Sequence, residues 1–87
     1  MKIWAKIYNG DRLEKNIIYE SELTENPKNY IKDLQEICYR LDISTPVSLP
    51  SHYKHFIKFN RIKYLPRDFI EEVDFTSFVM ELVIEKK

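Results

Sequence analysis

Residues 26–42, NPKNYIKDLQEICYRLD, hold the pattern that decides the fold. Their apolar side chains recur at i, i+1, i+4, i+7, i+8 and i+11, which places them in one stripe of an α-helix. The stripe consists of Tyr30, Ile31, Leu34, Ile37, Cys38 and Leu41. Asn26 suits an N-cap and Pro27 the first helical position. We therefore predict an amphipathic helix over Pro27–Leu41, and the flanking segments must supply the surface that buries its stripe.

The segment before this helix predicts a β-hairpin. Residues 2–8, KIWAKIY, alternate in the period of a strand, Asn9-Gly10 marks a turn, and residues 13–20 read as the returning strand. The length of the turn sets which residues of the two strands share a face, because a shift of one residue exchanges the faces. The apolar pattern favours a three-residue connection, with Gly10 left-handed in a bulge. That register joins two sets of side chains on one face: Ile3, Ala5 and Ile7 with Leu13, Ile17 and Tyr19.

The end of the chain predicts a strand over residues 75–86, which we place beside the first one. One face of it carries Phe78, Met80, Leu82 and Ile84, and the other carries Val79, Glu81, Val83 and Glu85.

The middle of the chain predicts shorter elements. Residues 47–49 suit a short edge strand, Pro50 opens a helix through about Phe59, and Asn60 is a plausible left-handed stop. Residues 61–65 suit a short strand before a turn at 66–68. The expected fold class is α+β in a single domain over residues 1–87. In it, a small, mainly antiparallel sheet carries one long amphipathic helix on one face, with a second short helical segment.

Composition narrows the classes of function. The 87 residues hold 14 basic and 14 acidic side chains, so no global field favours nucleic acid or membrane. A single cysteine fits a reducing compartment, and no apolar run resembles a signal peptide or membrane span. Gly10 is the only glycine, which excludes the glycine-dependent nucleotide and EF-hand motifs. We expect a cytoplasmic protein without a cofactor.

Three groups of residues could carry chemistry, and each has a structural interpretation that we favour. His52 and His55 are spaced for one helix face, but a zinc site needs at least three ligands. Cys38 lies on the apolar stripe, where burial suppresses the reactivity of a thiol. In residues 69–75, FIEEVDF, we expect the four apolar side chains to pin a turn to the core while the acids stay hydrated. The sequence thus predicts neither an enzyme nor a metal site.

The second face of the sheet is the preferred candidate for function. Trp4, Tyr8, Val79 and Val83 project from it together with Ile18. Either a helix or loop covers these side chains, or they form a partner surface, because contiguous exposed apolar area usually marks an interface. The favoured function is a small non-enzymatic protein-interaction module that is homodimeric through this face or through an edge strand.

A nucleic-acid-binding module is the alternative. Residues 52–67 contain five basic residues and no acid. In such a module Lys54, Lys58, Arg61 and Lys63 would contact phosphates, and Tyr53 or Phe59 would be available for base stacking. The acidic residues of 68–85 could instead neutralise the basic ones, and the zero net charge favours that interpretation.

The Asn9-Gly10 hairpin, the helix segment LQEICYRLD and the segment FIEEVDF together resemble a group of small uncharacterised bacterial proteins of clostridial type. The resemblance covers most of the chain and implies a cytosolic bacterial setting. It implies no activity, cofactor or site residue.

Overall fold

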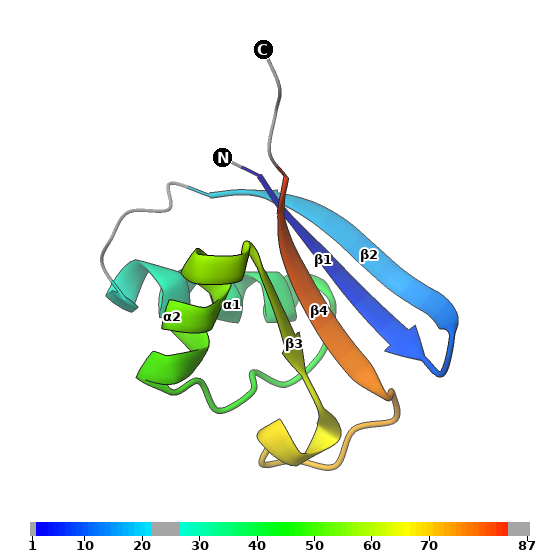
Figure 1. Ribbon diagram of the computed structural model, residues 1–87. Coiled ribbons are helices and arrows are strands. Elements are labelled where there is room, and N and C mark those ends of the chain that lie inside the picture. Colours follow the sequence, from blue (N-terminus) through cyan, green and yellow to red (C-terminus); the bar gives the residue numbers. More distant parts are fainter. Residues whose placement is uncertain (1, 22–26, 84–87) are drawn as a thin grey trace.

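Four strands form one antiparallel sheet, and both helices pack on the same face of it (Figure 1). This arrangement comes from a computed structural model that describes residues 2–21 and 27–83. The elements are β1 (Lys2–Asn9), β2 (Arg12–Glu20), α1 (Pro27–Arg40), α2 (Pro50–Phe59), β3 (Arg61–Tyr64), a 3-10 turn (Pro66–Asp68) and β4 (Ser77–Val83). The strand order is β2-β1-β4-β3, so β2 and β3 are the edges. The predicted α+β class and antiparallel sheet are confirmed. The two helices, of 14 and 10 residues, are not the predicted combination of one long helix and one short segment.

The β1–β2 hairpin reaches its register by a different route from the predicted one. Asn9 pairs with Arg12, so the connection has two residues rather than three, and Gly10 is left-handed with φ 65°. The register then shifts between Ile7 and Tyr8, where Glu14 is the extra residue of β2. This bulge restores the predicted face for most of β2, because one inserted residue exchanges the faces just as a longer loop would.

The bulge divides the predicted apolar set of β2. Ile17 and Tyr19 pair with Ala5 and Ile3 and face the helices, as predicted. Leu13 lies beyond the bulge, pairs with Tyr8, and therefore faces away from the helices, which contradicts its predicted position.

The C-terminal strand lies in the centre of the sheet and pairs with β1 as predicted. Ile3, Ala5 and Ile7 lie opposite Leu82, Met80 and Phe78. The part of the predicted strand after Val83 lies outside the described residues. The short strand β3 completes the sheet, with Ile62 opposite Met80 and Tyr64 opposite Phe78.

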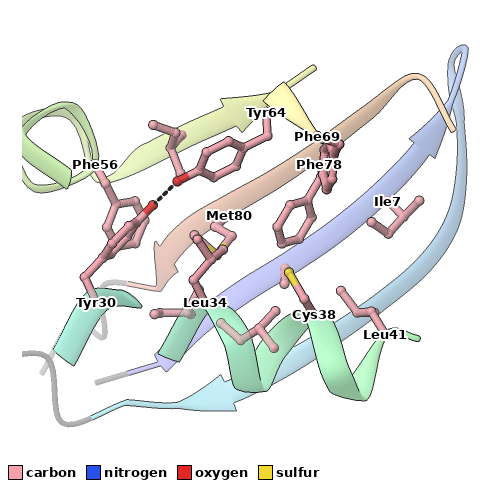
Figure 2. Packing of buried hydrophobic residues seen from close by; sticks show 14 of the residues in the cluster. Ile7, Tyr30, Leu34, Cys38, Leu41, Phe56, Tyr64, Phe69, Phe78 and Met80 are labelled. Atoms are coloured by element: carbon pink, nitrogen blue, oxygen red, sulfur yellow. Dashed lines mark hydrogen bonds between the residues drawn. The ribbon is translucent and has the colours of Figure 1, made fainter. Parts of the chain in front are cut away.

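The stripe of α1 covers this apolar face, as the sequence predicts. Tyr30, Leu34, Ile37, Cys38 and Leu41 are all buried. Figure 2 shows Leu34 and Cys38 projecting from α1 towards the residues of the sheet. Ile31 is the exception, at 36% exposed, because it lies at the side of the stripe. The predicted N-cap, Asn26, lies outside the described residues.

Helix α2 has the predicted bounds. It begins at Pro50 and ends before Asn60, whose φ of 57° is left-handed and turns the chain into β3. Phe56 is buried, and its ring lies 5.5 Å from that of Tyr30 on α1. The predicted edge strand at 47–49 does not form. The Val47 N–H donates to the carbonyl of Asp68 at 2.7 Å, which ties this extended segment to the 3-10 turn.

The loop that leads into β4 is held by only some of its apolar side chains. Phe69 and Phe75 are buried with their rings edge to face at 5.3 Å, and Val73 is half-buried. Ile70, which we predicted to help pin this loop, is 88% exposed.

Candidate interaction surface

The sheet surface opposite the helices is formed by the even-numbered residues of β1 and their cross-strand partners; we call it the open face. Within 2–21 and 27–83, no helix covers it (Figure 1). Its apolar members are Trp4, Tyr8, Leu13, Ile18, Val79 and Val83. All four residues of the predicted partner surface therefore share one face.

These apolar side chains differ in how far they are exposed. Val79, which lies between β1 and β3 in the sheet, is only 2% exposed. Trp4, Tyr8 and Val83 are half-buried. Ile18 and Leu13, on the edge strand β2, are 53% and 41% exposed. The apolar area that a partner could reach is therefore concentrated on β1 and β2.

Glu81 brings two basic side chains together on the open face. The Lys6 ammonium lies 2.9 Å from Glu81 Oε1, and Arg61 Nε lies 3.6 Å from the same oxygen. The Lys6 side chain is only 9% exposed, and its ammonium also lies 4.1 Å from the centre of the Trp4 ring. The Trp4 indole N–H donates to Asn16 Oδ1 at 3.2 Å.

These contacts show which polar groups on the open face already have a partner within the monomer. Lys6 and Glu81 are 75 residues apart in sequence, and their pairing depends on the β1–β4 register. Sequence alternation placed both residues on this face but gave no sign of the ion pair. Beside this ion pair, the Trp4 ring, Ile18 and Leu13 supply most of the apolar surface that a partner could cover.

The four basic residues predicted to bind nucleic acid do not share a surface. Arg61 and Lys63 alternate with the buried Ile62 and therefore lie on the open face. Lys54 and Lys58 lie on α2, on the other side of the sheet. All four are exposed, and Arg61 is already engaged with Glu81. The structure thus separates the set into two pairs.

The groups considered for catalysis or metal binding each have a structural role. His52 Nδ1 accepts a hydrogen bond from the Leu49 N–H at 2.8 Å, and its ring packs on Tyr64. The His55 ring packs on Phe59. Cys38 is fully buried, and removal from water raises the pKa of its thiol to about 12. Within the described part of the chain, no three His, Cys, Asp or Glu side chains are placed to hold a metal ion.

The exposed acids line an open hollow rather than an enclosed cleft. Residues 42–44 and 71–75 surround a space of about 570 Å³ that contains Asp42, Glu71, Glu72 and Asp74. Each of these four residues is exposed, which agrees with the prediction that the acids of FIEEVDF stay hydrated.

None of the described helices has the length and apolar content needed to cross a membrane. Comparison of the chain with protein-family models, with curated proteins and with solved structures gives no match.

Proposed function

We propose that this protein is a small non-enzymatic interaction module that forms a homodimer through the open face. The observation that carries the proposal is the exposed apolar area around Trp4 and Ile18, next to the ion pair between Lys6 and Glu81. A charge loses its hydration when it is covered, and this is costly unless the charge is paired. Because Lys6 and Glu81 pair within the face, a second copy could cover them without leaving either one unsatisfied.

The size of the face sets the expected affinity. Four strands about 4.8 Å apart, each about seven residues long at about 3.4 Å per residue, give a projected area of about 450 Å². Standard interfaces bury about 800 Å² of accessible surface per partner. The open face is therefore smaller than a standard interface, and buried area alone does not determine affinity. We expect a weak dimer, with a dissociation constant of about 100 μM.

The dimer should be abolished by a charge at Ile18. This side chain is 53% exposed and lies next to Trp4 across the β1–β2 register, so glutamate fits the monomer but would be desolvated in the dimer. We expect wild-type protein to elute as a dimer at about 1 mM and as a monomer at low micromolar concentration, as follows from the affinity above. Ile18→Glu should remain monomeric at both concentrations in size-exclusion chromatography with light scattering.

Ile70→Glu is the matched control, because Ile70 is 88% exposed on the loop between the 3-10 turn and β4 and belongs to none of the four strands. It should dimerise like wild type. Trp4→Glu should also give a monomer. Because this substitution removes the contacts of Trp4 with Lys6 and Asn16, it could also destabilise the monomer. The thermal melting of the variant must therefore be measured in parallel. A wild type that stays monomeric at about 1 mM would contradict the proposal, as would a dimer that Ile18→Glu leaves intact.

The placement of the reactive groups supports the non-enzymatic part of the proposal. The Cys38 thiol is held protonated in the core, and His52 Nδ1 is occupied by a backbone N–H. Neither is placed as an activated nucleophile or as a base beside one. The alternative, nucleic-acid binding by Lys54, Lys58, Arg61 and Lys63, receives less support because the four do not form one basic surface.

A further inference from the structure

The two helices form a pocket on the side of the sheet opposite the open face (Figure 1). Its volume is about 140 Å³, and most of its lining is apolar. The pocket lies near the start of each helix, and its walls are formed by Tyr30, Ile31, Ser48, Leu49, Pro50 and Tyr53. Tyr30 is only 1% exposed, whereas Leu49 is 55% exposed, so the pocket extends from the surface towards the core.

The volume of the pocket limits the size of a ligand. A cavity of about 150 Å³ lined by apolar side chains is large enough for benzene. At about 140 Å³, this pocket therefore has room for one six-membered ring with at most a small substituent.

The polar groups at the pocket already have partners within the protein. The Tyr30 hydroxyl lies 2.6 Å from that of Tyr64, as Figure 2 shows, and Ser48 Oγ lies 3.2 Å from the same Tyr64 hydroxyl. An apolar ligand can therefore displace water without leaving any of these three hydroxyls unpaired. Among the described residues that line the pocket none is charged, so a charged ligand would lose its hydration without gaining a partner.

Two tyrosine rings in the lining favour an aromatic ligand over an aliphatic one. The ring centres of Tyr30 and Tyr53 lie 5.5 Å apart, and the rings meet edge to face at 62°. Aromatic rings attract one another in this arrangement at separations of about 4.5–7 Å. A ring that fills the pocket contacts both tyrosines, because both line it.

We propose that the pocket between α1 and α2 binds an uncharged, single-ring aromatic compound. The ring would lie against Tyr30 and Tyr53, with Ile31 and Leu49 nearest to solvent. The few atoms of one ring gain little beyond the cost of immobilising it, so we expect a dissociation constant of about 0.5 mM for benzene. The site is independent of the dimer, since it uses the helices rather than the open face.

Titration of the intact chain with benzene tests this proposal, with isotope-labelled methyl groups observed by NMR. A bound aromatic ring shifts the resonances of nearby methyl groups through its ring current. Those of Ile31 and Leu49 should shift and reach about 90% of their full change at about 5 mM benzene, as follows from the expected affinity. The resonances of Ile18, on the open face, should stay constant. Benzoate, which adds a carboxylate to the same ring, should bind at least about tenfold more weakly.

Leu49→Asp removes one wall of the pocket without weakening the helix. Leu49 is the N-cap residue of α2 and makes no side-chain cap hydrogen bond, whereas aspartate is among the preferred N-cap residues. The variant should therefore melt no lower than wild type. It should nevertheless bind benzene about tenfold more weakly, because a carboxylate replaces an apolar wall.

Two controls accompany this variant. Val47→Asp makes the same kind of change at a residue that is 44% exposed and does not line the pocket, so it should leave the affinity for benzene within about twofold. Ile18→Glu, which removes the dimer, should bind benzene as wild type does. Failure of this proposal is therefore distinguishable from failure of the dimer.

The absence of a saturable shift at Ile31 and Leu49 would contradict the proposal. Equal binding of benzoate would also contradict it, as would binding that Leu49→Asp leaves unchanged. A larger shift at Ile18 than at Ile31 would place the ligand on the open face. Shifts at Ile31 and Leu49 that follow the protein concentration without benzene would show that a second copy, rather than a small ligand, occupies the pocket.

Discussion

Replacing Leu34 with alanine should lower the free energy of unfolding by about 2–5 kcal/mol, because the change leaves a cavity between α1 and the sheet. Leu34 is 1% exposed and lies near the middle of the helix stripe, facing the sheet (Figure 2). Urea denaturation followed by circular dichroism measures the loss. The variant should remain folded at low temperature if the wild type has the usual stability of about 5–15 kcal/mol.

Ile31→Ala is the matched control, since it removes an apolar side chain from the neighbouring turn of the same helix. Ile31 is 36% exposed, so we expect it to cost about 1 kcal/mol or less. Equal effects of the two substitutions would show that the predicted stripe is not the core of the protein.

Local signals were sufficient to predict the bounds of the two helices to within about one residue. Five of the six apolar residues at helical spacing are buried, so this spacing identifies the side of α1 that faces the sheet. Pro50 and Asn60 delimit α2 because each favours one backbone geometry, a fixed φ at the start and a left-handed φ at the end. These predictions hold because the physical cause lies within the segment itself.

The hairpin shows where alternation alone is insufficient. Two registers place Ile17 on the core face: a longer loop, or a two-residue loop followed by a bulge. Alternation shows only which face of the sheet a residue occupies. Both registers place Ile17 on the same face, so alternation cannot distinguish them. Only the position of Leu13 differs, and the structure places it on the open face.

The open face illustrates a second limit of the sequence. Alternation assigned Trp4 and Val79 to one face, but exposure within a face depends on neighbours from other strands. Val79 lies between Lys6 and Lys63 in the sheet and is only 2% exposed. The contribution of β3, which brings Lys63 beside β4, is a long-range pairing that no local pattern predicts.

Raising the pH above 9 should destabilise the protein, and Cys38 should contribute about 2–3 kcal/mol of this loss by pH 11. Burial raises the pKa of its thiol to about 12 from an ordinary value near 9, and a hydrogen bond with Thr45 only partly opposes the shift. The folded state therefore keeps its proton at a pH where the unfolded chain has released it. The stabilising effect is complete below pH 9 and disappears as the pH rises towards 12.

The Cys38→Ala variant isolates this contribution. It should be less stable than wild type at pH 8, because it leaves a small cavity, but it should lose about 2–3 kcal/mol less than wild type between pH 8 and pH 11. Every contribution other than that of the thiol is common to both proteins and cancels in the comparison. The buried hydroxyls of Tyr30 and Tyr64, 2.6 Å apart, also have raised pKa values and add to the alkaline loss in both. Urea denaturation at the two pH values measures the difference, and an identical pH dependence in the two proteins would show that the thiol is not held in the core.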